Sequence, residues 1–190
     1  MTSGLEYADV PTPIGTFRVV YRDRTVLEVG LHERGGSRLA LPSKGSHRRA
    51  PPDGSPPRQL GEYFRRKRDA FEVDAEPAGA SEFDRHIYAA LLKVPAGRTI
   101  TYGDLAKSAG YAPTAARAVG GAMARNPIPI IIPCHRVVGD AGGLTGFGMG
   151  LWRKRWLLDR EGAWPVRIRV GQGARDRGQR TLDEVSAVLA

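Results

Sequence analysis

The stretch TYGDLAKSAGYAPTAARAVGGAMAR, residues 101–125, decides the fold of the second half of this chain. Its hydrophobic spacing predicts a short helix over 102–108, a turn around Gly110 and a second helix that starts near Thr114. Two short helices joined in this way form a helix-turn-helix, whose second helix can enter a DNA groove. The same arrangement is also a common packing device, so the pattern alone leaves DNA binding open.

The second of these helices is made largely of small residues. They are Ala115, Ala116, Ala118, Gly120, Gly121, Ala122 and Ala124. A glycine inside a helix costs about 1 kcal/mol relative to alanine, so a close neighbour of this backbone is expected. Tight packing against another helix and contact with a DNA groove explain the composition equally well. Arg117 projects from this smooth surface and could insert into a base stack, although an isolated arginine is more often a solvated charge.

Upstream, the segment SEFDRHIYAALLKV, residues 81–94, predicts another helix. Apolar side chains recur along it at helical spacing, and Ser81 with Asp84 forms a capping-box pattern at its start. A domain boundary is expected just before this helix, near residues 77–80, where Pro and Gly interrupt the pattern.

The first part of the chain is predicted to form a small sheet with one helix. Residues 14–31 alternate apolar and polar positions and predict a β-hairpin that turns at 21–24. Residues 59–68 have helical spacing, and 71–76 look like a short strand. Between them, residues 35–58 are rich in Pro, Gly, Ser and Arg and predict a mobile surface loop.

Downstream of Asn126, the run PIPIIIPCHRVV is apolar and contains three prolines, which disfavour a helix. It predicts a buried extended segment that delivers Cys134 and His135 to a fixed position. A glycine-rich loop over 139–150 follows, and then an amphipathic helix over 151–162 that ends at its glycine.

The expected fold class is therefore α/β in the sense of α+β. A small N-terminal domain of β-sheet and helix spans residues 1–76, and a mostly helical C-terminal domain with the helix-turn-helix spans 81–162. Residues 163–190 form a C-terminal extension, with little pattern beyond a short helix near 181–189.

Composition narrows the class of partner. The 190 residues carry 29 Lys and Arg against 20 Asp and Glu, a formal net charge of +9 that favours a polyanion such as nucleic acid. One cysteine cannot form an internal disulfide or a four-cysteine zinc site. No segment approaches the ~18 apolar residues of a membrane span. We expect a monomeric cytoplasmic, nucleoid-associated protein without metal, cofactor or membrane contact.

Cys134 is the candidate nucleophile. A lone cysteine is usually an inert small residue, but Cys134 follows a proline in a stiff segment and precedes His135. The thiolate is the reactive form, and a thiol with a pKa of ~8.5 needs a base or a positive field to reach it near neutral pH. His135 can be that base, directly or through one water, with a carboxylate to orient its ring. The residues alone do not identify this carboxylate.

The sequence PCHRV at 133–137 lies between RAVGGAMARNPIPIII and GGLTGFGMGLWRKRWLLDREG. This combination closely resembles the active-site region of the O6-alkylguanine-DNA alkyltransferases, also called methylated-DNA–protein-cysteine methyltransferases, of bacterial type. The similarity extends from about Ser81 to Gly162. It implies a protein that flips O6-alkylguanine, and less readily O4-alkylthymine, out of double-stranded DNA. The alkyl group then moves irreversibly to the protein's own cysteine in a single turnover.

The resemblance also implies a role for each matched residue. Cys134 matches the alkyl acceptor, and His135 matches the histidine that deprotonates it through a water. Glu161 matches the carboxylate that completes this relay. Asn126 matches the asparagine that braces the active-site turn, and Tyr102 matches the tyrosine that assists flipping and donates to guanine N3.

Arg117 matches the arginine finger that fills the gap left by the flipped base. The other expected DNA contacts are Thr101, Tyr102, Ala116, Ala118, Gly120 and Arg125. The expected base pocket consists of Met123, Val137, Phe147, Gly148 and Met149. Two of these depart from the family pattern: Phe147 stands where tyrosine is frequent, and Met149 stands where glycine is common, which would narrow the pocket against bulky adducts.

Three alternatives belong to other classes. A noncatalytic alkyltransferase-like binder carries tryptophan in place of the acceptor cysteine, so Cys134 argues against it. A transcription factor regulated by alkylation would be supported by an appended metal-binding sensor domain, and a thiol hydrolase would need a site for an acyl substrate. Neither feature is apparent in the sequence.

Overall fold

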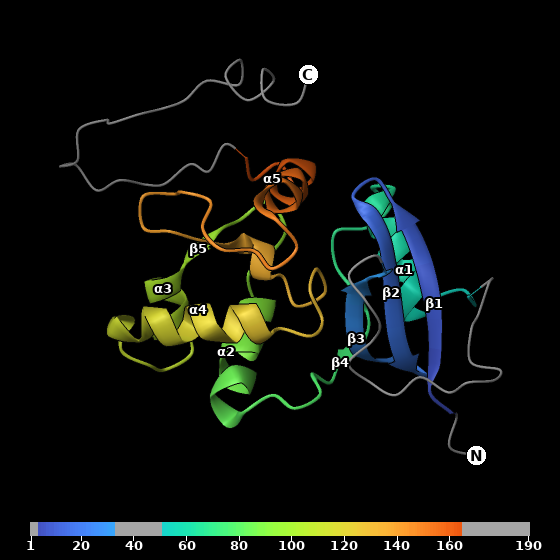
Figure 1. Ribbon diagram of the computed structural model, residues 1–190, viewed down its shortest axis with the longest axis horizontal. Coiled ribbons are helices and arrows are strands. Elements are labelled where there is room, and N and C mark those ends of the chain that lie inside the picture. Colours follow the sequence, from blue (N-terminus) through green and yellow to red (C-terminus); the bar gives the residue numbers. More distant parts are fainter. Residues whose placement is uncertain (1–3, 33–50, 165–190) are drawn as a thin grey trace.

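The computed structural model describes residues 4–32 and 51–164. The fold is mixed α+β, as predicted: a small sheet with one helix lies beside a group of helices (Figure 1). The predictions for residues 33–50 and 165–190, including the helix near 181–189, lie outside the described residues.

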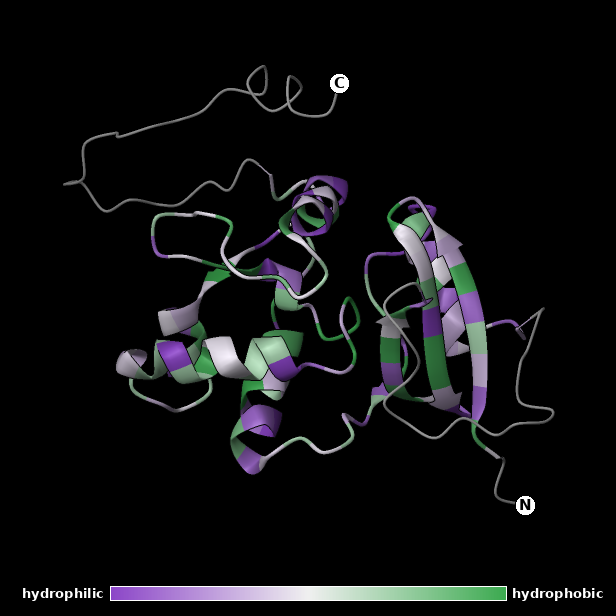
Figure 2. Ribbon diagram, viewed as in Figure 1, coloured by the Kyte–Doolittle hydropathy of each residue, from purple (hydrophilic) through white to green (hydrophobic). Residues whose placement is uncertain are grey.

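The sheet has the strand order β1-β2-β3-β4. Its strands are β1 (Glu6–Thr12), β2 (Gly15–Arg22), β3 (Thr25–Leu31) and β4 (Asp74–Ala75). The first three are antiparallel, which confirms the hairpin, and β4 runs parallel to β3. Strand β1 was not predicted. Hydrophobic and hydrophilic residues alternate along these strands (Figure 2), and Phe17 and Val19 of β2 are completely buried.

Helix α1 (Pro56–Phe64) begins three residues before the predicted helix and ends four residues earlier. A proline fits the first turn of a helix, because its φ is nearly helical and its missing N–H would have had no partner there. The helix ends where Arg66 adopts a φ of 59°. The predicted mobile loop is therefore wrong for residues 56–58, where both prolines are buried in α1.

The predicted strand over 71–76 is reduced to the two residues of β4. Ahead of it, the backbone of Glu72 pairs with a side chain instead of a strand. Its N–H donates to Gln59 Oε1 at 2.8 Å, and its carbonyl accepts from Gln59 Nε2 at 3.2 Å.

The helical part contains α2 (Glu82–Leu92), α3 (Tyr102–Ser108), α4 (Ala116–Arg125) and α5 (Leu151–Arg160). The Ser81 side chain caps α2 by accepting from the Asp84 N–H at 3.1 Å, as predicted. Helices α3 and α4 form the helix-turn-helix, although a 3-10 turn over Pro113–Ala115 delays the start of α4. Gly162, with φ of 71°, ends α5, and the Gly162 and Ala163 N–H groups bond back into the helix in a Schellman motif.

The segment between α4 and Cys134 is a compact turn, so the predicted extended run is wrong. Ile130 has a φ of 78°, and the Ile132 N–H donates to the Ile128 carbonyl at 2.9 Å. Asn126 holds this turn from both sides: its Nδ2 donates to the Ile132 carbonyl at 2.9 Å, and its Oδ1 accepts from the Ile128 N–H at 3.0 Å. These bonds and the burial of the isoleucines outweigh the local preference of prolines for extended backbone.

Several hydrogen bonds join the first part of the described chain to the helical part. The Val29 N–H of β3 donates to the Pro127 carbonyl at 2.8 Å, next to the compact turn. Arg153 of α5 donates to the Ile14 carbonyl at 2.7 Å, and Arg160 donates to the Tyr63 carbonyl at 2.8 Å. The first part of the chain thus supports the elements that carry Cys134 and Glu161.

Candidate active site

Cys134 begins a 3-10 turn over Cys134–Arg136, directly after the compact turn. The exposed fraction of the residue is 7%, so Cys134 is buried at the edge of the core. Burial raises the pKa of the thiol, while a hydrogen bond with Asn126 and the charge of Lys154 lower it. The site therefore contains groups that favour the thiolate against the cost of its burial.

His135 and Glu161 form a buried pair whose side chains have no exposed surface. The distance from His135 Nε2 to Glu161 Oε1 is 3.0 Å. Burial alone would raise the pKa of Glu161, but His135 and Arg136 outweigh it and hold this pKa well below its usual range. Glu161 is therefore ionised and accepts the proton of Nε2.

The other ring nitrogen of His135 is left as an acceptor. Burial lowers the pKa of this imidazole, so the neutral form prevails at pH 7. Within residues 4–32 and 51–164, Nδ1 has no hydrogen-bond partner although it is buried. A buried nitrogen with a free lone pair, on the residue adjacent to Cys134, is suited to receive a proton.

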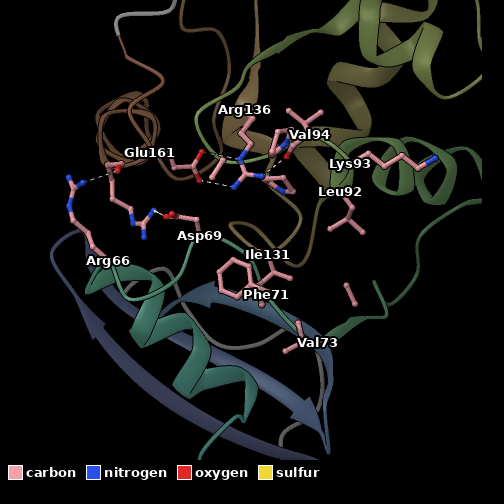
Figure 3. A pocket seen from close by; sticks show the side chains of 16 residues that line it. Arg66, Asp69, Phe71, Val73, Leu92, Lys93, Val94, Ile131, Arg136 and Glu161 are labelled. Carbon is pink, nitrogen blue, oxygen red and sulfur yellow. Dashed lines mark hydrogen bonds and ion pairs between the residues drawn. The ribbon is translucent and has the colours of Figure 1, made fainter.

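Glu161 is held by two further residues. Arg136 donates from Nε to Oε2 at 2.9 Å and from Nη2 to Oε1 at 2.8 Å, and it anchors its third nitrogen on the Val94 carbonyl at 2.6 Å. Figure 3 shows this arginine and Glu161 pointing toward one another at the wall of a cavity. Tyr63 Oη of α1 donates to Oε1 at 2.7 Å. Neither partner was predicted, although Arg136 stands in the quoted PCHR motif.

Lys154 is a further residue that the sequence analysis missed. It is fully buried in α5, and its Nζ donates to the Val137 carbonyl at 2.6 Å and to the Thr145 carbonyl at 2.7 Å. Burial lowers its pKa to about 8. The sequence could have indicated this burial, because Lys154 lies three residues before Leu157, on the apolar face of α5.

Most of the small residues of helix α4 are exposed or partly exposed. Only Val119 and Ala122 of this helix are buried, and Arg117 and Ala118 are exposed. A Cβ on Gly120 would meet Tyr102 at an ordinary 3.9 Å, and one on Gly121 would meet the end of its own helix's Arg125 at 3.1 Å. Tight helix packing therefore does not account for these glycines.

The side chains expected to contact DNA differ in the hydrogen bonds and ion pairs that they make within the protein. Within the described part of the chain, Arg117 makes no hydrogen bond or ion pair. Among the described residues, the Tyr102 hydroxyl has only long contacts, at 3.5 Å to the Thr145 carbonyl and at 3.4 Å to the Thr145 hydroxyl. Thr101 caps α3 by accepting from the Asp104 N–H at 3.1 Å. Arg125 is bound to the Asp84 carboxylate at 2.7 and 3.2 Å.

The residues expected to form the base pocket differ in their relation to the hydrophobic cluster that contains Cys134. Val137 and Met149 belong to this cluster, Met123 and Phe147 pack against it, and Gly148 is exposed. The cavity of about 760 Å³ in Figure 3 is a different space, because it is lined by residues such as Phe71, Leu92 and Arg136 and by none of the expected pocket residues.

In the described ranges, no group of three or more His, Cys, Asp and Glu side chains is arranged to hold a metal ion. None of the helices there combines the length and the hydropathy needed to cross a bilayer.

Comparison with known proteins shows the family to which this chain is related. The family described as "6-O-methylguanine DNA methyltransferase, DNA binding domain" matches residues 82–163. A methylated-DNA–protein-cysteine methyltransferase of Mycolicibacterium paratuberculosis is 39% identical over 155 residues, which cover 81% of this chain and 90% of that protein. The chain belongs to the methylated-DNA–protein-cysteine methyltransferase family.

Other members of the methyltransferase family agree in sequence and in fold. The Salmonella typhimurium enzyme is 36% identical over 169 residues, covering 80% of this chain and 93% of its own. The crystal structure of the Mycobacterium tuberculosis O6-methylguanine methyltransferase superposes with a TM-score of 0.68 at 35% identity, over 86% of this chain and 97% of that one. The crystal structure of the M. tuberculosis OGT in complex with DNA superposes with a TM-score of 0.70 at 35% identity, over 83% of this chain and 93% of that one.

Proposed function

We propose that this methyltransferase repairs double-stranded DNA by moving the alkyl group of O6-alkylguanine, and less readily of O4-alkylthymine, to Cys134. The observation that carries the proposal is the buried pair beside this cysteine. Glu161 fixes one nitrogen of His135 and leaves the other as a proton acceptor. This is the arrangement that activates a thiol nucleophile.

In the proposed reaction, a water carries the thiol proton to Nδ1 of His135, and the Cys134 thiolate attacks the alkyl carbon. A bond between sulfur and carbon forms while the bond between carbon and O6 breaks, and its electron pair remains on guanine. Tyr102 donates toward N3 and stabilises the leaving purine anion. A thioether is not readily cleaved by ordinary side chains, so each molecule reacts once.

Access to the damaged base requires that the nucleotide leave the stack, at a cost of a few kcal/mol. Helix α4 supports this step because the small residues on its partly exposed face allow the helix to approach the minor groove. Arg117, exposed on that face, fills the vacated stack. Thr101 and Tyr102 lie at the start of α3, next to α4. Arg125, which is paired with Asp84 but exposed, lies at the end of α4.

The proposal divides the chain into domains over residues 1–76 and 81–162, followed by the extension 163–190. The match of the DNA-binding family to residues 82–163 supports the second of these limits.

Because the relay lies within one chain, a monomer suffices for the reaction. A net charge of +9 suits a protein that remains close to the nucleoid.

The proposal is tested by counting turnovers. The protein is mixed with a tenfold excess of duplex oligonucleotide that carries O6-methylguanine, and the repaired guanine is quantified over time. We expect close to one methyl group removed per protein molecule, after which the reaction stops. Repeated turnover, or no repair at all, would contradict the suicide mechanism.

A further inference from the structure

Tyr63 lies far from Glu161 in the chain, yet its hydroxyl donates to the same carboxylate oxygen that binds His135. The Oη to Oε1 distance is 2.7 Å, and both residues are buried. Tyr63 belongs to α1, so the first part of the chain touches the proposed relay directly. The alkyltransferase resemblance assigns no role to this residue.

Several contacts hold the Tyr63 side chain in one place. The guanidinium of Arg160 lies 3.7 Å from the ring centroid, and its Nε donates to the Tyr63 carbonyl at 2.8 Å. The ring also packs against Phe64 and Phe71, at centroid distances of 5.5 and 5.3 Å. A tyrosine fixed in this way donates from a constant position.

Oxygen Oε1 of Glu161 accepts three hydrogen bonds, from Tyr63, from Arg136 and from His135. Each donor stabilises the negative charge and weakens the attraction of the carboxylate for the remaining protons. Without the Tyr63 donor, Oε1 would bind the imidazole more strongly, and His135 would become more basic. A histidine already protonated near neutral pH cannot take the proton of Cys134.

We propose that Tyr63 is a positioning residue of the relay, which orients Glu161 and keeps His135 neutral. This inference rests on the proposed function of the site. Burial and Glu161 raise the pKa of Tyr63 well above its usual value, so its hydroxyl remains a donor at physiological pH. The other charged or titratable groups around the pair are Arg136, Arg160, Lys154 and the thiol of Cys134.

The test uses Tyr63→Phe, which removes one oxygen and keeps the ring. The matched control is Tyr88→Phe, because Tyr88 is also buried and its hydroxyl donates to the Ala122 carbonyl at 2.8 Å, away from the relay. The pKa of His135 is measured by NMR titration of protein labelled with ¹⁵N-histidine. In parallel, the rate of reaction with free O6-benzylguanine is measured as a function of pH.

We expect Tyr63→Phe to raise the pKa of His135 by about half a unit and to move the acidic limb of the rate profile to higher pH by the same amount. Tyr88→Phe should leave both unchanged. A purely structural role would lower the stability of Tyr63→Phe and leave both readouts where they are in the unmodified protein. That result, or a shift to lower pH, would overturn the inference.

A second measurement covers the case in which Tyr63→Phe does not fold. Incorporation of 3-fluorotyrosine at position 63 makes the phenol a stronger hydrogen-bond donor, so the pKa of His135 should fall. An unchanged or raised pKa of His135 would overturn the inference. The titration needs no alkyl transfer. A shifted His135 in a protein that repairs nothing would refute the proposed function alone, and an unshifted His135 in an active protein would refute the role of Tyr63 alone.

Discussion

Nε2 of His135 lies 3.0 Å from Oε1 of Glu161, and neither side chain is exposed to solvent. The carboxylate sits at the end of α5 and the imidazole in the 3-10 turn after Pro133, so this pair joins two separate segments. Its geometry fixes the tautomer of the ring and turns Nδ1 into the proton acceptor.

Replacement of Glu161 by Gln should slow alkyl transfer by about a hundredfold, because the neutral amide no longer stabilises the protonated imidazole. DNA affinity, measured by fluorescence anisotropy, should remain nearly the same. Asp159→Asn is the control, since it removes an exposed carboxylate from the same helix. An unchanged transfer rate in Glu161→Gln would remove this residue from the mechanism.

Replacement of Lys154 by Met should raise the pKa of the Cys134 thiol, because the lysine charge lowers it. One pKa unit would slow the reaction at neutral pH by about tenfold, and the deficit should shrink as pH rises and the thiolate forms without assistance. The rate with free O6-benzylguanine is the readout. Arg155→Met removes a charge from a partly exposed position of α5 and should react at the rate of the unmodified protein. A deficit that does not depend on pH would contradict this role of Lys154.

Lys154 also makes stability depend on pH. Its pKa is about 8 in the folded protein against a usual value of 10.5, so between these values the unfolded chain binds more protons and stability increases with pH. From pH 7 to pH 10, the unmodified protein should gain about 2 kcal/mol relative to Lys154→Met in urea denaturation. A difference between the two proteins that stays constant over this range would show that the burial of the charge has no such cost.

Replacement of Arg117 by Ala should impair repair of duplex DNA far more than reaction with free O6-benzylguanine. Loss of a side chain that fills the stack should cost at least about tenfold in duplex, because base extrusion costs a few kcal/mol. Arg85→Ala removes one exposed charge from α2 and controls for electrostatics alone. Equal losses with both substrates would refute the finger role.

The sequence predicted the elements whose signals are local. The turn at Gly110, the cap of α2 at Ser81 and the neighbouring Cys134 and His135 are all readable over a few residues. Glu161 is 26 residues from His135, so it entered only through the family resemblance. Tyr63 is 98 residues from Glu161, and a buried tyrosine on an amphipathic helix looks like any core residue.

The compact turn before Cys134 was missed for a related reason. Three prolines favour extended backbone locally, but the amide of Asn126 closes the chain on itself and places Ile130 at a φ of 78°. The start of α1 was missed because the two prolines at 56 and 57 look like loop residues, although they fit the first turn of a helix.

In the proposed reaction, Cys134 itself receives the alkyl group. The direct measurement is tandem mass spectrometry of the peptide containing Cys134 after reaction with a duplex that carries O6-methylguanine. We expect this peptide to gain the mass of one methyl group in place of the thiol hydrogen, with the modification located on the sulfur and no gain in Cys134→Ser. An unmodified Cys134 in a protein that has repaired the DNA would contradict the claim.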